Sequence, residues 1–165
     1  MSIRLSVVQR LRPDWFASGV LWVDTAGRGL VEITKQVRGF LEQVEAHHGV
    51  VLMFLRHTSA SLVIQENAAP EVRTDLTMAL DRLAPADAGW RHDSEGPDDM
   101  PAHVKAMLTG VSLHVPVSEG TLALGTWQGV FVVEHRDAAH RREVVLQFIG
   151  QRKPAGSGGA LHPRT

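Results

Sequence analysis

The sequence predicts a single α+β domain in which antiparallel or mixed sheets form a β-sandwich-like core with about three helices. Two observations carry this prediction. Runs with the period of a strand are concentrated toward the two ends of the chain, and no regular βαβ alternation is present. The length of 165 residues corresponds to about one domain. We therefore assign residues 1–150 to one domain and the Gly/Pro/Ser-rich residues 151–165 to a flexible tail.

The first residues of the chain predict strands. Apolar and polar residues alternate over residues 2–9, which is typical of a half-buried strand and predicts that a strand opens the chain. Two further strands, over residues 20–25 and 30–33, flank the turn Ala26-Gly27-Arg28-Gly29. We expect these two strands to form a hairpin.

A helix is predicted to follow, with Thr34 as its N-cap and Gly49 as the residue that ends it. Its apolar positions recur at i, i+3, i+4 and i+7: Val37, Phe40, Leu41 and Val44. On this assignment His47 and His48 lie at the end of the helix, and we expect both to be surface residues.

The middle of the chain predicts two strands and two more helices. Strands are expected over residues 50–57 and 61–65, because both stretches are rich in β-branched or apolar residues. A helix begins at Pro70 and ends before Pro85. A long acidic loop then leads to a short helix that begins at Pro101 and is capped by Gly110.

The last third of the chain is predicted to be β-structure. Strands are expected over residues 111–117, 121–126, 130–135 and 143–149, separated by turns that contain glycine. His114 falls inside the first of these strands, where we expect it to be packed or exposed rather than to bind a ligand.

Composition excludes several classes of function. Seventeen basic and eighteen acidic residues give a net charge of −1, so the sequence predicts no nucleic-acid partner. Cysteine is absent, which excludes disulfides, thiol nucleophiles and zinc–thiolate sites. No apolar run is long enough for a membrane span or a secretory core, so we expect no membrane partner and a cytoplasmic location. Nine histidines remain as candidate ligands and proton carriers.

The acidic loop before the predicted third helix is the strongest candidate site. His92, Glu95, Asp98 and Asp99 run into a helix that carries His103, so nitrogen and oxygen ligands can converge in a small volume. This pattern predicts a divalent metal site, with zinc or magnesium as the candidate ions. The alternative is that Asp98 or Asp99 only caps the helix and complements its dipole.

Two predicted strand ends carry further candidates. His57 is followed by Thr58 and Ser59, a turn that can present backbone and hydroxyl donors to an anion. The alternative is a connecting turn beside a buried histidine. His135 and Arg136 end another strand, and arginine is suited to bidentate binding of phosphate. Trp127 and Gln128 could form the floor of a pocket for a planar ring or could belong to the core.

Three blocks of residues together resemble a known family. They are His57-Thr-Ser-Ala-Ser-Leu62, continuing to Asp75; His92-Asp-x-Glu95-Gly96-x-Asp98-Asp99-Met100-Pro101-Ala102-His103; and Gly125-Thr-Trp127-Gln128-Gly129 with Glu134-His135-Arg136. Their order and spacing resemble the YjbQ-type family, whose members are described as secondary thiamine-phosphate synthases. The likeness covers about residues 27–150. It implies a β-sandwich-like α+β subunit, a homotrimer, and a metal-associated pocket near the subunit contacts.

The resemblance also implies a reaction and roles for individual residues. The reaction joins hydroxymethylpyrimidine pyrophosphate to a thiazole phosphate and releases pyrophosphate. The implied metal ligands are His57, His92, His103 and His135. The implied catalytic residues are His92, Glu95, Asp99, His103 and Arg136, with Glu95 and Asp99 orienting the metal or its water. The implied groups that bind substrate or phosphate are Thr58, Ser59, Lys105, Trp127, Gln128 and Arg136.

Two other functions stay open on the sequence. One is metal-dependent hydrolysis of a small phosphorylated metabolite, and the other is a trimeric metal- or metabolite-binding protein without turnover. This chain departs from the family pattern at Ala69, where members usually have an aspartate before the second helix. If that aspartate is only an N-cap, its loss affects stability alone. If it is a ligand or a base, its loss affects activity.

Overall fold

The computed structural model describes residues 2–5 and 8–154. The described chain contains eight strands and three helices. In chain order they are β1 (Trp15–Asp24), β2 (Gly29–Glu32), α1 (Thr34–Gln43), β3 (Ala46–Leu55), β4 (Ala60–Glu66), α2 (Pro70–Leu83), α3 (Asp99–Thr109), β5 (Ser112–Ser118), β6 (Thr121–Leu122), β7 (Gln128–Glu134) and β8 (Arg141–Arg152). Most of the predicted tail, residues 155–165, lies outside the described residues.

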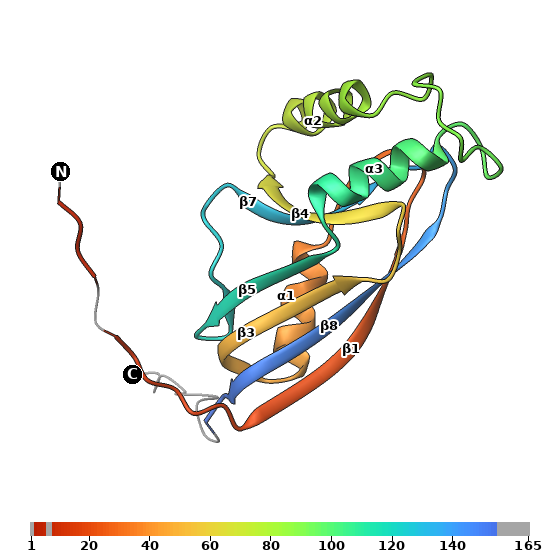
Figure 1. Cartoon of the computed structure of the whole chain (residues 1–165). Helices are drawn as coiled ribbons and strands as arrows, with labels where there is room; N and C mark the ends of the chain where they lie inside the picture. Colours follow the sequence, from red (N-terminus) through yellow and green to blue (C-terminus); the bar gives the residue numbers. More distant parts are fainter. Residues whose placement is uncertain (1, 6–7, 155–165) are drawn as a thin grey trace, which may run out of the picture.

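The strands form two antiparallel sheets, which confirms the predicted α+β class. One sheet has five strands in the order β1-β8-β3-β5-β6, and the other has three in the order β2-β7-β4. Figure 1 shows β1, β8, β3 and β5 side by side, with β4 and β7 beyond them. Apart from the local β5–β6 hairpin, each strand therefore pairs with strands that are distant in the sequence.

The hydrophobic core lies between the sheets and α1. Alternate residues of β3, including Val51 and Met53, point inward and meet Leu62 of β4 and Val132 of β7. The helix contributes Val37 and other residues of its apolar stripe to the same cluster. This period-two burial on the strands and helical burial on α1 is what the sequence pattern predicts.

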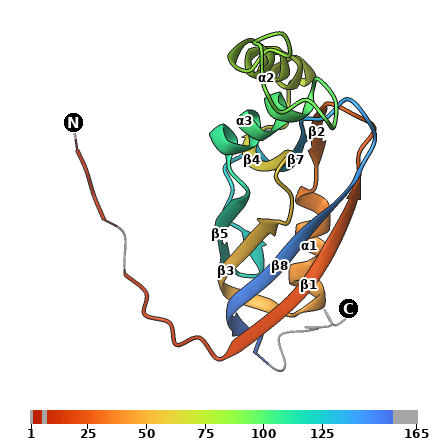
Figure 2. The ribbon, with the colours of Figure 1, turned by 45° about the vertical axis from the view of Figure 1, so that its right-hand side comes forward.

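The other two helices lie together at one end of the molecule. Figures 1 and 2 show α2 and α3 beside the three-stranded sheet, with the acidic loop leading into α3. The two helices differ in burial: α2 has no fully buried residue, whereas α3 buries Asp99 and Lys105 among others. The predicted bounds of α2 are confirmed, and α3 begins at Asp99, two residues before the predicted start at Pro101.

The predicted opening strand is wrong. No regular structure covers residues 2–5 and 8–14, and Ile3 and Leu5 are almost fully exposed. The first strand instead begins at Trp15, which pairs with Gly150. Alternation alone is insufficient, because a strand also needs a partner for its backbone groups.

The predicted hairpin is also wrong. β1 pairs with β8 and β2 pairs with β7, so the turn between β1 and β2 carries the chain from one sheet to the other. Gly27 and Gly29 in this turn both have positive φ, at 117° and 147°. The glycine signal therefore located a turn correctly, but it did not identify the pairing of the strands.

The end of α1 differs from the prediction as well. The helix stops at Gln43, and Glu45 takes the left-handed conformation (φ 53°) that often follows a helix. Gly49, expected as the stop, lies inside β3 opposite Gly150. His47 and His48 are consequently strand residues, and both are partly buried rather than exposed.

None of the helices in the described part of the chain is long and apolar enough to cross a bilayer.

Candidate functional site

The start of α3 brings together a carboxylate and two imidazoles. His92 Nε2 lies 2.8 Å from Asp99 Oδ2, and His103 Nε2 lies 3.4 Å from the same oxygen. The helix itself provides this arrangement, because residues 99 and 103 are four apart and share one face. Asp99 is 2% exposed, and its Oδ2 has no hydrogen-bond partner. A buried carboxylate oxygen in this state normally has a proton or a cation near it.

The tautomer of His103 is fixed by the main chain. Its Nδ1 lies 3.0 Å from the carbonyl oxygen of Thr58, which can only accept a hydrogen bond, so Nδ1 carries the proton. In the neutral ring Nε2 therefore presents a lone pair toward Asp99 Oδ2. Two lone pairs facing each other favour a cation between them, and Nδ1–H bound to a carbonyl is typical of metal-binding histidine.

Arg136 connects this cluster to the end of β7. Its guanidinium binds Asp99 Oδ1, Asp98 Oδ2 at 3.0 Å and the Glu95 carbonyl oxygen at 2.6 Å. Burial raises the pKa of Asp98, but the Asp137 backbone N–H and Arg136 outweigh it and hold that pKa below its usual value. The aspartates therefore do not cap α3 through their side chains, since Asp98 at the N-cap makes no capping hydrogen bond.

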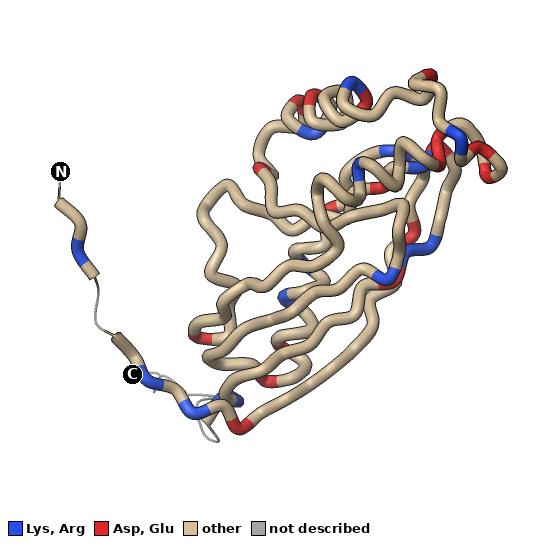
Figure 3. The backbone as a smooth tube through the Cα atoms, viewed as in Figure 1, with Lys and Arg blue, Asp and Glu red and all other residues tan. Residues whose placement is uncertain are grey.

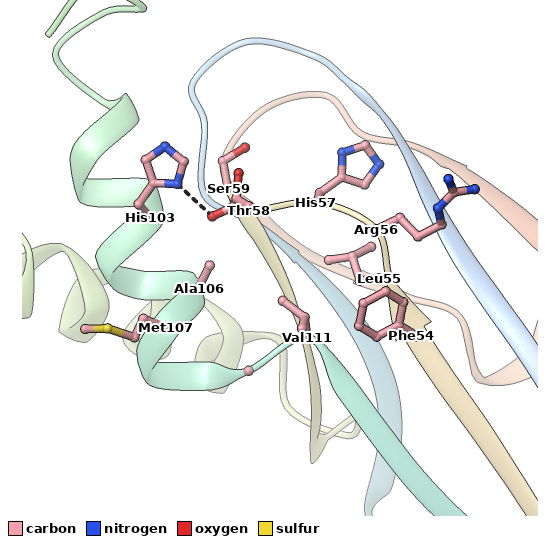
Figure 4. Close-up of a pocket in the computed structure, with 11 residues that line it drawn as sticks. Phe54, Leu55, Arg56, His57, Thr58, Ser59, His103, Ala106, Met107 and Val111 are labelled. Carbon is pink, nitrogen blue, oxygen red and sulfur yellow. Dashed lines mark hydrogen bonds between the residues drawn. The ribbon is translucent and has the colours of Figure 1, made fainter. Parts of the chain in front are cut away.

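A pocket of about 800 Å³ opens beside His103, a volume within the range of small-molecule sites. Figure 4 shows His103 on α3 facing the turn that carries Thr58 and Ser59. One side of the pocket is polar, with Arg56, His57, Thr58, Ser59 and His103, and the other is apolar, with Phe54, Leu55, Ala106, Met107 and Val111. Such a pocket suits a ligand with both a polar group and a ring.

The structure does not bring His57 to the Asp99 cluster. Its Nε2 accepts the backbone N–H of Glu143 at 3.0 Å, and its Nδ1 lies 3.4 Å from Arg142. Burial and the nearby Arg142 lower the pKa of His57, which keeps the ring neutral. His57 thus lines the pocket while both ring nitrogens face β8.

His135 and Lys105 lie on the other side of α3. Positions 103 and 105 are about 200° apart around a helix, so their side chains diverge. Lys105 Nζ binds Asp81 Oδ1 at 2.5 Å, and both residues line a separate cavity of about 270 Å³ together with His135. His135 is 2% exposed and shares a 2.9 Å hydrogen bond with Ser61 Oγ. Burial and the charge of Lys105 lower the pKa of His135 to about 4.

Trp127 and Gln128 lie at the opposite end of β7 from His135 and Arg136. Seven strand residues separate the two ends by about 20 Å, so these residues do not reach the Asp99 cluster of the same chain. Trp127 is 65% exposed, and Gln128 accepts the backbone N–H of Gly125 at 2.8 Å. The Glu95 side chain is exposed as well, and only its carbonyl contacts Arg136.

Sequence reasoning assigned no role to three charged groups near the site. Arg56 lines the large pocket and makes only a long contact, 3.4 Å, with Glu143. Arg142 and Glu134 form a buried bidentate pair, with Nε to Oε2 at 2.7 Å and Nη2 to Oε1 at 2.5 Å. The Glu134 pKa is raised by burial but lowered more strongly by Arg142, by the Arg136 N–H and by Thr25. The signals available were the adjacency of Arg56 to His57 and that of Glu134 to His135.

Comparison with known proteins identifies the family. The family model described as "UPF0047 protein YjbQ-like" matches residues 20–151, which is most of the chain. The chain belongs to the YjbQ (UPF0047) family. It is 44% identical over 133 residues to the UPF0047 protein sll1880 of Synechocystis, covering 80% of this chain and 90% of that protein. It is 43% identical over 120 residues to UPF0047 protein YjbQ of Salmonella typhimurium, covering 73% and 85%.

Solved structures of YjbQ-like proteins have the same fold. A YbjQ-like protein of unknown function from Sulfolobus solfataricus matches with a TM-score of 0.77 and 28% identity, covering 83% of this chain and 99% of that one. The conserved hypothetical protein TT1486 from Thermus thermophilus matches with a TM-score of 0.70 and 40% identity, covering 77% and 97%. The similarity to this family therefore holds for the three-dimensional fold as well as for the sequence.

Proposed function

We propose that this YjbQ-family chain is a metal-dependent enzyme acting on a small phosphorylated metabolite, by the reaction of a secondary thiamine-phosphate synthase. The observation that carries the proposal is the buried Oδ2 of Asp99, which makes no hydrogen bond and faces the Nε2 atoms of His92 and His103 at 2.8 and 3.4 Å. The three ligand atoms lie within 4.8 Å of one another, and the donor set of two imidazoles and a carboxylate suits zinc.

The residues present fit such an ion. His92, Asp99 and His103 would hold it, and when bound it would supply positive charge to neutralise a pyrophosphate leaving group. Magnesium remains the alternative ion, although a site with two imidazoles favours zinc over magnesium. Arg136 keeps one oxygen of Asp99 occupied and so directs the other toward the imidazoles.

The pocket beside the cluster supports a heterocyclic phosphate as substrate. Phe54, Met107 and Val111 offer an apolar wall for a ring, while Thr58 and Ser59 offer hydroxyl and backbone donors for phosphate. In the proposed reaction the thiazole nitrogen displaces pyrophosphate at the pyrimidine methylene carbon, so one C–N bond forms as one C–O bond breaks. Holding both rings in line in one pocket is the main requirement.

The test is an assay of thiamine phosphate formation by the purified chain with zinc or magnesium. Asp99→Asn and His103→Ala are expected to lower the rate about a hundredfold or more, and the exposed His114→Ala serves as control. Full activity and full metal content in His103→Ala would overturn the proposal. Pyrophosphate release that ignores the thiazole acceptor would instead indicate hydrolysis, and metal binding without either reaction would indicate a binding protein.

The proposal includes a homotrimer in the cytoplasm, where phosphorylated metabolites are retained. Its support is the outer face of the five-stranded sheet, where apolar residues stand in register on neighbouring strands. Phe16 lies opposite Ile149, and Val20 lies opposite Val145, which in turn lies opposite Phe54. Figure 3 shows few charged residues along these strands and many around α2 and α3. An exposed apolar face of this kind is typical of a subunit interface.

A further inference from the structure

A second group of possible metal ligands lies away from the Asp99 cluster. His47 Nε2 is 3.0 Å from Glu119 Oε2, and His48 Nε2 is 3.0 Å from Glu119 Oε1. All three ligand atoms lie within 4.8 Å of one another. Figures 1 and 2 show that β3 begins and β5 ends at the end of the molecule opposite α2 and α3. This group is therefore separate from the site described above.

A β-bulge makes it possible for both histidines to face the same way. Neighbouring residues of a regular strand point to opposite faces. Here the pairing with β8 shifts between Ala46 and His48, so His47 is an extra residue in β3. Ala46 stays fully buried, while the rings of His47 and His48 approach to 4.1 Å between centroids. In a regular strand one of the two histidines would point inward and the other outward, whereas the bulge lets both imidazoles lie side by side.

The third ligand comes from a backbone conformation that a glutamate rarely adopts. Glu119 and Gly120 form the two-residue loop between β5 and β6, with φ of 51° and 77°. Two positive φ angles define a turn that prefers Asn-Gly. Gly120 is required, because a Cβ there would lie 2.9 Å from the Ala46 carbonyl oxygen. The turn does not require a glutamate at position 119. The position does, however, bring the Glu119 carboxylate to the two imidazoles.

We propose that His47, His48 and Glu119 form a second divalent-cation site, with zinc as the matching ion. The observed 3.0 Å contacts are close to the spacing of about 3.3 Å between ligands of tetrahedral zinc. The site is open on one side, since the Glu119 side chain is 72% exposed, which leaves a position for water or another ligand. A bound ion would join the start of β3 to the β5–β6 hairpin.

The experiment uses the full-length chain with His92→Ala and His103→Ala, which removes two ligands of the Asp99 cluster. Equilibrium dialysis against zinc chloride is followed by elemental mass spectrometry. We expect one zinc per chain to remain. Adding His48→Ala or Glu119→Asn is expected to weaken this binding at least about tenfold, and adding His114→Ala, an exposed histidine on the neighbouring strand β5, leaves it unchanged.

Two further measurements keep the result independent of misfolding. Asn and Gly both suit the turn position, so Glu119→Asn and Glu119→Gly are expected to keep or raise the melting temperature without metal while they lose zinc binding. Zinc at about 100 times the dissociation constant of the parent double variant is expected to raise its melting temperature by about 5 °C, and to raise that of the Glu119 variants by clearly less. No zinc on the parent, or equal zinc on the Glu119→Gly variant, would overturn the proposal.

Discussion

The main chain of Thr58 and the side chain of Arg136 organise the Asp99 cluster without being ligands themselves. Thr58 accepts the Nδ1 proton of His103, and Arg136 binds the oxygen of Asp99 that faces away from the imidazoles. From the sequence, both residues were predicted to bind phosphate, because a hydroxyl and a guanidinium suit that role. Every residue has a main-chain carbonyl oxygen, so the identity of residue 58 could not predict that its carbonyl fixes the tautomer of His103.

His135 predicts a dependence of stability on pH. Its pKa is about 4 in the folded chain, where burial and Lys105 disfavour the charged ring and Glu134, Arg142 and Asp81 make smaller contributions, against 6.5 for a free histidine. The unfolded state therefore binds more protons between these values, and stability falls as pH falls from about 6.5 to about 4, by about 3 kcal/mol from this group.

Urea unfolding at several pH values between 4 and 7 measures this effect. The His135→Gln variant is expected to show a flatter dependence than the parent over that range, whereas His114→Gln, at an exposed position, is expected to follow the parent. If parent and His135→Gln lost stability in parallel, the buried histidine would not be the source.

At the scale of elements, helix spacing predicted more of the site than strand position did. The i, i+4 pair Asp99 and His103 meets as the helix period requires, and the same period turns Lys105 away. His57 and His135 each end or follow a strand, but the strands belong to different sheets, β3 to the five-stranded sheet and β7 to the three-stranded one. Sheet membership depends on long-range pairing, which single-sequence patterns do not determine.

The start of α2 is where this chain has Ala69 in place of the aspartate that is usual in the family. Ala69 is the N-cap of α2 and makes no side-chain capping hydrogen bond. It follows β4, whose other end adjoins the Thr58–Ser59 turn about 20 Å away. Ala69→Asp is therefore expected to raise the free energy of unfolding by about 0.5–2 kcal/mol and to leave metal content and turnover unchanged.

Ala69→Asn is the matched control, because asparagine caps a helix without a carboxylate. Equal gains in thermal stability for the two variants would confirm a capping role. A gain in turnover for Ala69→Asp alone would show that the carboxylate takes part in the chemistry.

At the scale of the whole molecule, the outer face of the five-stranded sheet predicts assembly. Phe16 is 60% exposed and Trp22 61%, both on the edge strand β1, and Phe54 on β3 of the same sheet is 50% exposed. Val20→Lys places a charge in the middle of this face. We expect sedimentation equilibrium to show about three times 18.1 kDa for the parent and 18.1 kDa for the variant.

Leu83→Lys provides the control, since Leu83 is also well exposed but lies at the end of α2. It is expected to keep the mass of the parent. A parent that sediments as a monomer, or a Val20→Lys variant with the mass of the parent, would contradict assembly through this face.

The order of strands also determines when the molecule can fold. Among the strands that the structure describes, β1 pairs with β8 alone, and β2 and β4 both pair with β7. In each sheet, therefore, an interior strand comes late in the sequence. During synthesis the first two thirds of the chain therefore expose strands whose backbone groups have no partner. Such non-local pairing slows folding and leaves apolar strands open to aggregation. We expect the nascent chain to depend on chaperones until its last strand has emerged from the ribosome.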